Sequence, residues 1–193
     1  VAFLNTLLRY FADTIGKLNS LNNISKFMKS QGQDVAVKSI ASYLGYFKDA
    51  YLLSTVDRFD IHGKKLLESN EKLYFSDIGL RNLIAGGERQ GDMEKILENV
   101  VYQQLLRMGY TVNVGQLRVG EVDFVCTKSN ERIYVQVTYL IASEETEDRE
   151  FGCLENIQDN YPKYVISMTP LVRKSDRQGI IHMGLREFLR NGF

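Results

Sequence analysis

Two carboxylates lie close together in residues 120–126, a run rich in β-branched and aromatic residues. This composition predicts a β-strand, in which alternate side chains share a face. Glu121 and Asp123 are therefore expected on one face, opposite Val122, Phe124 and Cys126. Two like charges inside an apolar sheet are costly unless a cation compensates them, and carboxylate oxygens are ligands that Mg²⁺ prefers. The pair therefore indicates a metal site, and a metal bound there could polarise a phosphoryl oxygen and activate water.

A second strand is predicted at residues 133–139, and the polar residues 127–132 before it indicate the turn of a β-hairpin. Tyr134, Gln136 and Thr138 would share one side of this second strand. The hairpin therefore brings an amide and a hydroxyl to the strand beside the two carboxylates.

A structural role is the alternative interpretation for these residues. Glu121 and Asp123 would then lie at a hydrated strand edge, where they cap the turn or pair with Arg118. His62 and His182 have no ligand partner at metal-binding spacing in the sequence, so both are expected to be structural or solvated.

The composition is that of an ordinary globular protein, with 44% hydrophobic and 25% charged residues. The 24 basic residues balance the 24 acidic ones, so no global field draws the chain to nucleic acid or to a membrane. Cys126 and Cys153 form neither a disulfide framework nor a zinc pattern, which is typical of a reducing cytoplasm. No apolar run approaches the roughly 18 residues of a membrane span. We therefore expect a cytoplasmic protein without a membrane partner.

The chain is long enough for one large domain or two small ones. The most loop-like stretch, residues 85–91, predicts a boundary between a domain of residues 1–86 and a domain of residues 87–193. Because Val1 stands in the middle of an apparent helix, we expect the chain to be a fragment of a longer protein.

The first domain has the pattern of a winged helix. Hydrophobic spacing predicts helices at residues 1–17 and 24–29, the second capped by Asn22 or Asn23, and a third helix capped by Asp34. A β-hairpin is predicted next, with strands at residues 51–59 and 64–67, and then a separate short strand at residues 73–75 before a helix that starts near Asp77.

A winged helix suggests DNA binding, with the third helix in the major groove and the hairpin as the wing. Lys38, Ser42 and Tyr46 would lie on the exposed side of that helix, and Lys64 and Lys65 on the wing. Since the basic residues are few, a packing or oligomerisation unit is the alternative.

The second domain begins with a helix at residues 92–108, in which Glu98 stands beside the apolar stripe. The remaining predicted elements are a strand at 110–114, the hairpin, a helix at 146–158, strands at 164–168 and 179–182, and a helix at 185–190.

This order resembles the PD-(D/E)xK nuclease superfamily, the restriction-endonuclease-like fold. The resemblance places the helix acid of the family at Glu98, its Asp at Asp123, and its third-strand pair at Gln136 and Thr138. Thr138 departs from the family pattern, because it stands where the family has the Lys that orients or activates water. Some superfamily members relocate that Lys, and Lys163 is the candidate here.

A second resemblance covers almost the whole chain. Six motifs, Y-F-S-D-I-G-L-R at 74–81, L-E-N-V-V-Y at 97–102, G-E-V-D-F-V at 120–125, Y-V-Q-V-T-Y at 134–139, R-E-F at 149–151 and Y-P-K-Y-V at 161–165, are similar to those of a prokaryotic family of predicted AAA-type ATPases. Those proteins combine a P-loop module, a winged helix and an uncharacterised nuclease-like domain. This chain has no G-x-x-x-x-G-K-[ST] motif, so the resemblance implies the region after the ATPase module.

Together these patterns predict an α/β (α+β) protein, with a winged-helix-like module followed by a restriction-endonuclease-like αβββαβ domain around a mixed sheet. The expected function is nucleic-acid-associated, with DNA and the chain's own upstream ATPase module as partners. If the site is active, it is a Mg²⁺-dependent DNA hydrolase; the alternative is an inactive DNA- or protein-binding module that regulates the ATPase.

In the active interpretation Asp123 and Gln136 would bind the metal, Glu98 would support a second metal or a water, and Glu121 would assist. Lys163 would complete the catalytic set. Arg149 would contact a phosphate or, alternatively, form an exposed pair with its neighbour Glu150.

Overall fold

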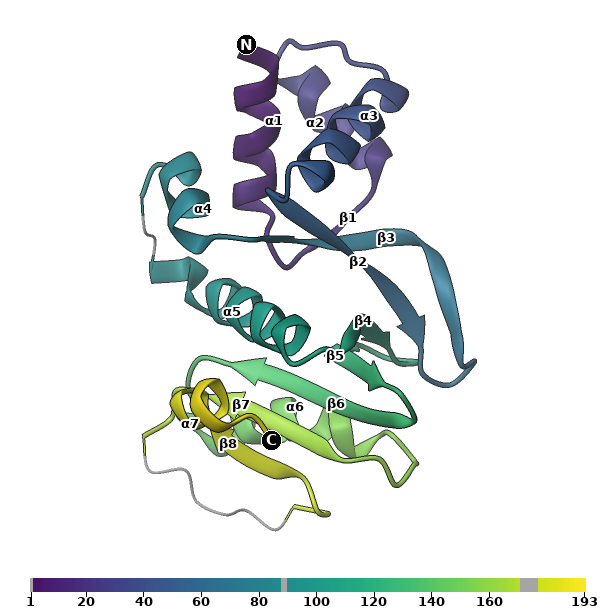
Figure 1. The fold of residues 1–193 in the computed structure, drawn as a ribbon, viewed down its shortest axis with the longest axis vertical. Helices are drawn as coiled ribbons and strands as arrows, with labels where there is room; N and C mark the ends of the chain where they lie inside the picture. The colour runs from purple at the N-terminus through teal and green to yellow at the C-terminus, as the bar shows by residue number, and fades with distance from the viewer. Residues whose placement is uncertain (1, 88–89, 171–176) are drawn as a thin grey trace. The chain divides into compact units, whose positions relative to one another are not determined.

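A computed structural model describes residues 2–87, 90–170 and 177–193 (Figure 1). The protein is a mixed α/β protein, as the sequence predicts at this level. The chain forms two compact units. The first unit contains the residues up to Asp57 together with Glu68–Asp92, and the second contains Arg58–Leu67 together with Met93–Phe193.

The first unit is built around three helices and the base of a long hairpin. Its elements are α1 (Ala2–Asp13), β1 (Leu18–Asn19), α2 (Leu21–Ser30), α3 (Val37–Asp49), β2 (Leu53–Asp60), β3 (Lys65–Phe75), α4 (Ile78–Ala85) and the 3₁₀ turn η1 (Gln90–Asp92). β1 pairs antiparallel with β3, with Leu18 opposite Lys72. The apolar stripes of the helices form the core of this unit, which includes Leu7, Phe11, Ile24, Met28 and Ile40.

The helix starts differ from the sequence prediction at two places. Ser20, not Asn22 or Asn23, caps α2, because its hydroxyl accepts the Asn23 N–H at 3.2 Å. α3 begins after Ala36, which offers no side-chain cap, and not at Asp34. The start of α4 is confirmed, since Asp77 accepts the Leu80 N–H at 2.6 Å.

The prediction of a separate short strand at residues 73–75 is wrong, because β3 runs without interruption from Lys65 to Phe75. The polar residues 68–72 look like a loop in the sequence, yet they belong to the strand. Asn70 has a left-handed φ of 63°, and Glu71 and Lys72 pair with β1. The short strand β1, which sequence periodicity did not predict, therefore lies along this polar segment.

The second unit is a mixed sheet between helices. Its elements after the hairpin tip are α5 (Met93–Arg107), β4 (Thr111–Gln116), β5 (Glu121–Lys128), β6 (Glu131–Thr138), α6 (Glu144–Glu155), β7 (Lys163–Ser167), β8 (Ile181–Gly184) and α7 (Leu185–Asn191). Strands β4, β5 and β6 are antiparallel neighbours, and β7 and β8 continue the sheet in parallel beside β6.

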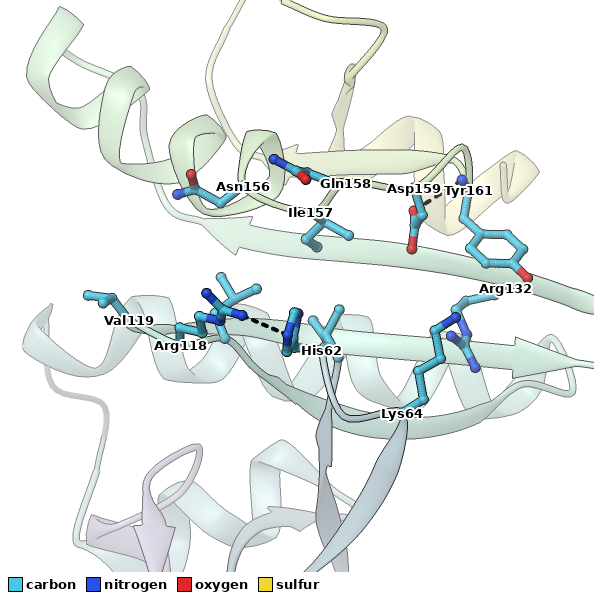
Figure 2. A pocket seen from close by; sticks show the side chains of 12 residues that line it. His62, Lys64, Arg118, Val119, Arg132, Asn156, Ile157, Gln158, Asp159 and Tyr161 are labelled. Carbon is cyan, nitrogen blue, oxygen red and sulfur yellow. Dashed lines mark hydrogen bonds between the residues drawn. The ribbon is translucent and has the colours of Figure 1, made fainter.

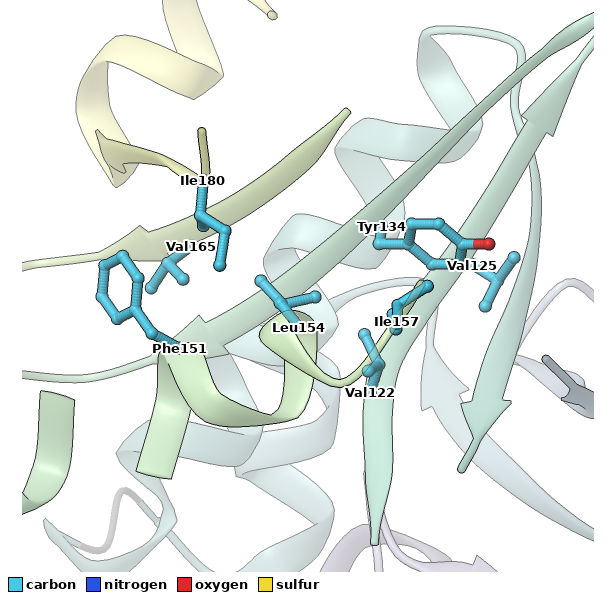
Figure 3. Packing of buried hydrophobic residues seen from close by; sticks show 8 residues of the cluster. All are labelled: Val122, Val125, Tyr134, Phe151, Leu154, Ile157, Val165 and Ile180. Carbon is cyan, nitrogen blue, oxygen red and sulfur yellow. The ribbon is translucent and has the colours of Figure 1, made fainter. Parts of the chain in front are cut away.

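The two long helices of this unit cover opposite faces of its sheet. Phe124 stacks on Tyr102 of α5, with ring centroids 6.1 Å apart, whereas the next residue, Val125, packs in a core cluster with Phe151 and Leu154 of α6 (Figure 3). Consecutive side chains of a strand point to opposite faces. The remaining members of the cluster are Val122, Tyr134, Ile157, Val165 and Ile180.

The tip of the β2–β3 hairpin belongs to the second unit, which differs from its expected role as the wing of the first. Arg58, Phe59 and Asp60 pair in parallel with residues 114–116 of β4. Ile61 continues this attachment by donating its N–H to the Gln116 carbonyl at 3.1 Å. Lys64, which lies at this tip, is therefore part of the second unit.

The β5–β6 hairpin has a shorter turn than predicted. Its strands extend to Lys128 and Glu131, so the turn is Ser129 and Asn130 rather than residues 127–132, and Ser129 takes a left-handed φ of 53°. In the parts of the chain that the structure describes, no helix is long and apolar enough to cross a membrane.

Candidate functional site

The carboxylate Asp123 lies at an irregularity of strand β5. In the pairing with β4, Asn113 is opposite Val125 but Gly115 is opposite Val122, so three steps on β5 match two on β4. Such a β-bulge breaks the alternation of side chains. Because of it, Val122 packs on the α6 face with Val125, and the prediction that Val122 shares a face with Phe124 is wrong.

Side chains take the place of ladder hydrogen bonds where the regular pairing of β5 with β6 ends. The regular pairing ends with Phe124 opposite Val135. Beyond it, the Asp123 N–H donates to Gln136 Oε1 at 3.1 Å, and the Val137 N–H donates to Asp123 Oδ2 at 2.9 Å. Buried backbone donors need partners, so this reciprocal pair supplies what the strands do not.

The Gln136 amide also reaches helix α6. Its Nε2 donates to Glu150 Oε2 at 3.0 Å, while Glu150 Oε1 accepts from Nε and Nη2 of Arg149 at 2.9 and 2.7 Å. The Glu150 side chain is only 8% exposed, whereas that of Arg149 is 67% exposed. The hydrogen bond to Glu150 and its charge raise the pKa of Arg149. Arg149 thus forms the predicted pair with its neighbour, but the prediction that the pair is exposed is wrong for Glu150, which is buried.

The pKa of the Cys153 thiol is affected by the carboxylates of the same region. Its thiol donates to the Glu150 carbonyl at 3.1 Å. Burial raises the pKa of Cys153 to about 12, and the nearby charges of Asp123 and Glu150 act in the same direction. A thiol with so high a pKa is a poor nucleophile at neutral pH.

These groups border a depression of about 450 Å³, which we call the carboxylate pocket. Its lining consists of Val119, Gly120, Glu121, Gln136, Asp148, Arg149, Glu150, Gly152, Cys153 and Asn156. The pocket unites Gln136 and Glu121 from the predicted set with the acids of α6, and Asp123 adjoins it through Gln136.

The residues of this pocket do not fit the Mg²⁺ site expected from the sequence. Gln136 Oε1 faces a backbone donor, and its NH₂ group occupies the side toward Glu150. One Asp123 oxygen accepts the Val137 N–H. Among the described residues, no group of three or more His, Cys, Asp or Glu side chains has the arrangement of a metal site. Mg²⁺ is usually bound through one or two carboxylates in near-octahedral geometry. Here the central side chain is the Gln136 amide, which forms hydrogen bonds through both its oxygen and its nitrogen.

Glu98, Lys163 and Thr138, like Asp123, lie outside the carboxylate pocket lining. Glu98 is half-buried on α5. Lys163 stands opposite Tyr134 in the β6–β7 pairing, and its Nζ donates to the Asp159 carbonyl at 2.8 Å. Thr138 is buried, and its hydroxyl has no hydrogen-bond partner in the described part of the chain. Lys163 therefore serves the segment after α6, two residues along the sheet from the partner of Gln136.

A second, larger pocket of about 820 Å³ lies in the same unit, and we call it the basic pocket (Figure 2). One wall is the hairpin tip with the β4–β5 loop, and the other is the segment that follows α6. Its lining is Ile61, His62, Lys64, Leu117, Arg118, Val119, Arg132, Asn156, Ile157, Gln158, Asp159 and Tyr161. Val119 and Asn156 also line the carboxylate pocket, so the two pockets adjoin.

Charge in the basic pocket is predominantly positive. Lys64, Arg118 and Arg132 face a single carboxylate, Asp159. Arg118 Nη2 lies 2.7 Å from His62 Nε2 (Figure 2). Because a guanidinium has only donors, His62 Nε2 is the acceptor in this contact.

Aromatic rings hold Arg132 in place. Its guanidinium lies 5.0 Å from the centroid of Phe59 and 5.4 Å from that of Tyr161, both within cation–π range. Its Nε is buried and has no hydrogen-bond partner in the ranges that the structure describes. Behind it, Asp159 accepts the Tyr134 hydroxyl at 2.6 Å, and burial together with this carboxylate raises the pKa of Tyr134.

Sequence reasoning did not find the basic pocket. The sequence predicts Lys64 on a wing and Arg118 as a partner of the carboxylates. The parallel pairing of β2 with β4 joins residues more than fifty positions apart. Nothing local in the sequence indicates that pairing, although the position of all three cations in or beside predicted turns was a usable signal.

The remaining predicted nucleic-acid contacts are on exposed positions. Lys38 and Ser42 are exposed on α3, and the Ser42 hydroxyl donates to the Lys38 carbonyl of its own helix at 3.1 Å. Tyr46 is 63% exposed on the same helix. Lys65 is exposed at the start of β3.

The chain is similar to proteins whose names state no function. Residues 1–91 match a family described as "Domain of unknown function (DUF8612)". An uncharacterized protein from Haemophilus influenzae is 36% identical over 164 residues, which cover 85% of this chain and 40% of that protein. The uncharacterized protein MJ1544 from Methanocaldococcus jannaschii is 31% identical over 156 residues, which cover 78% of this chain and 33% of that protein. The chain thus spans less than half the length of these relatives.

Protein VC1899 from Vibrio cholerae, known from a crystal structure, aligns with all of this chain and with 55% of its own, at a TM-score of 0.35 and 14% identity. A similarity at this level supports no argument about fold or function.

Proposed function

We propose that this chain binds nucleic acid through a winged helix and a nuclease-like domain whose metal site is replaced by hydrogen bonds. The Gln136 amide carries the proposal. It is engaged by the Asp123 N–H on one side and by Glu150 on the other, at the position where the resembled nucleases hold a metal. The domain would keep the nucleic-acid-binding surface of a nuclease but would not hydrolyse the nucleic acid.

The order of elements in the second unit supports the nuclease-like assignment. A helix, three antiparallel strands, a helix and a parallel strand follow one another from α5 to β7. Asp123 and Gln136, the residues that match the motif, lie on adjacent strands and are hydrogen-bonded.

The first unit supports the winged-helix assignment. A short strand between α1 and α2 pairs with the second strand of a hairpin that follows α3, which is the connectivity expected of the motif. α3 would be the recognition helix, and its exposed Lys38, Ser42 and Tyr46 would meet the nucleic acid.

Gel shifts with duplex DNA at a series of salt concentrations test this proposal. Binding should weaken steeply with salt, because each cation–phosphate contact releases counterions. Lys38→Gln should lower the affinity and reduce the salt slope by about one. Lys17→Gln removes the same charge from an exposed position outside α3 and should leave both quantities unchanged. A flat salt slope, or equal effects of the two variants, would contradict the proposal.

The alternative is a Mg²⁺-dependent DNA hydrolase, for which the carboxylates Glu121 and Glu150 at one pocket are the supporting observation. A plasmid-nicking assay with Mg²⁺ or Mn²⁺ separates the two functions. Binding without nicking supports our proposal, whereas nicking that is lost in Asp123→Ala supports the hydrolase.

The resemblance to predicted AAA-type ATPases suggests a biological role for the proposed nucleic-acid binding. We propose that the region reports nucleic-acid binding to an ATPase module elsewhere in the longer protein. The six motifs shared with that family support this proposal, and the greater length of the two relatives is compatible with it. Nucleic acid should then change the ATPase rate of the longer protein, and Lys38→Gln should weaken that change.

A further inference from the structure

The basic pocket brings together cations and a stacking surface that the sequence keeps far apart. Lys64 comes from the hairpin tip, Arg118 from the β4–β5 loop and Arg132 from β6. Only Asp159 among the lining residues carries negative charge, and it already accepts the Tyr134 hydroxyl and the Tyr161 N–H. The electrostatic character of the pocket therefore favours an anion.

The pocket also offers a flat surface for a ring. The Arg132 guanidinium lies 5.4 Å from the ring centroid of Tyr161, a residue that is 43% exposed. Apolar side chains of Ile61, Leu117 and Ile157 complete the lining. A volume of about 820 Å³ falls in the range of small-molecule and cofactor sites, well above the need of a simple inorganic anion.

We propose that the basic pocket binds a nucleoside phosphate, with the phosphate on Lys64 and Arg118 and the base on the partly exposed Tyr161. Bases stack on aromatic rings and guanidinium planes without requiring a sequence. The His62 ring fixes the Arg118 guanidinium by accepting one of its N–H groups, which leaves its other donors for phosphate oxygens.

The nucleotide has two possible sources with the same chemistry, the terminal nucleotide of a strand or a free mononucleotide. The adjoining carboxylate pocket shares Val119 and Asn156 with this one, so a strand end held here would continue past the exposed Arg149. If the ligand is a strand end, this inference extends the proposed function and rests on it. If the ligand is a free mononucleotide, the inference does not depend on the proposed function.

Calorimetry with the 193-residue chain tests the pocket directly. The probes are thymidine monophosphate, thymidine and inorganic phosphate. We expect the monophosphate to bind at least about tenfold more tightly than either fragment, because charge-assisted hydrogen bonds and stacking each contribute on the order of one decade in affinity. Equal binding of thymidine or of inorganic phosphate would overturn the inference.

Matched variants locate the binding. Lys64→Gln should weaken the monophosphate about tenfold, whereas Lys17→Gln, the same change at an exposed residue of the first unit, should alter it less than twofold. Tyr161→Leu should weaken the monophosphate but not inorganic phosphate, since it removes only the stacking ring. Equal effects of the two lysine variants would place the ligand elsewhere and overturn the inference.

Anisotropy with a 3′-labelled oligonucleotide, with and without a 5′ phosphate, separates the sources. A preference for the phosphorylated end that Lys64→Gln abolishes assigns the pocket to strand ends, and mononucleotide binding without that preference assigns it to free nucleotides. Failure of duplex binding in the gel shift would remove the proposed function while leaving the mononucleotide result intact. Failure of mononucleotide binding with normal gel shifts would remove only this inference.

Discussion

Asp123 and Gln136 hold adjacent strands together through their side chains. Gln136 Oε1 accepts the Asp123 N–H at 3.1 Å, and Asp123 Oδ2 accepts the N–H of Val137 at 2.9 Å. The pair lies where the regular ladder between β5 and β6 ends, beside the bulge in the pairing of β4 with β5. A position that matches a metal-binding motif in sequence thus has a structural role that needs no metal.

Replacing Gln136 should lower the stability of the protein, because the hydrogen bonds of its side chain are lost. Gln136→Leu leaves the Asp123 N–H and one Glu150 oxygen without their partner, and we expect a loss of about 1–3 kcal/mol in the free energy of unfolding. Urea denaturation measures it. Gln158→Leu, an exposed glutamine of the same unit, should change the stability by less than about 0.5 kcal/mol. Similar values for the two variants would mean that the hydrogen bonds of Gln136 contribute nothing to stability.

Thr138 offers the opposite test. Its buried hydroxyl has no hydrogen-bond partner among the described residues, so removing the hydroxyl should relieve a desolvation penalty. We expect Thr138→Val to keep or raise the stability, by up to about 1 kcal/mol. Thr14→Val is the contrast, because Thr14 Oγ1 donates to the Tyr10 carbonyl at 2.8 Å and its removal should destabilise. A Thr138 variant that loses more stability than the Thr14 variant would reveal a partner for its hydroxyl.

Arg81 is the largest fully buried side chain of the protein's described residues. Its Nε donates to the Ala12 carbonyl at 2.9 Å, and its Nη2 donates to Asp92 at 2.6 Å. Lysine cannot reproduce this fork of donors. Arg81→Lys should therefore cost about 1–3 kcal/mol, since one ammonium group cannot keep the bonds to both the Ala12 carbonyl and Asp92.

Thermal unfolding with Arg107→Lys as the control measures this loss. Arg107 is exposed at the end of α5, so its replacement by lysine should be nearly neutral. A melting temperature of Arg81→Lys close to that of the control would refute a structural role for the buried ion pair.

His182 should make the stability depend on pH. Burial lowers the pKa of His182 from its ordinary value of 6.5, although the charge of Glu147 acts in the opposite direction. The unfolded state therefore binds the proton more readily than the folded state between the two pKa values. Stability should be full above about pH 6.5 and should fall as the pH drops toward the lowered value.

Urea denaturation between neutral and mildly acidic pH checks this sign. The wild type should lose more stability over that range than His182→Gln, in which the amide can keep the contact that His182 Nε2 makes with Ser167 Oγ at 2.8 Å. Equal slopes for the two proteins would exclude His182 as the responsible group.

Much of the fold could be predicted from local patterns. The hydrophobic spacing of residues 92–108 predicts α5, and Asp77 identifies the start of α4, because both signals act within one or two helical turns. The β5–β6 hairpin follows from two β-branched runs with a polar turn between them. These elements agree with the structure to within a few residues.

The site could be predicted only in part, because non-local pairing decides it. Strict alternation puts Asp123 on one face of β5 and both Val122 and Phe124 on the other. The bulge that breaks this alternation is a property of the β4–β5 register, which involves Asn113 and Gly115. The sequence shows which residue types are present at 123 and 136. It does not show that their polar atoms bond to the backbone of the neighbouring strand.

Titration of Mn²⁺ by calorimetry tests the central claim most directly. If the Gln136 amide is a hydrogen-bond bridge between β5, β6 and α6, the wild type should show no saturable heat at millimolar metal. Gln136→Glu should gain saturable binding, because it adds a carboxylate between Asp123 and Glu150 and removes the amide donor. Saturable binding by the wild type that Asp123→Asn abolishes would contradict the account and restore the metal-dependent nuclease.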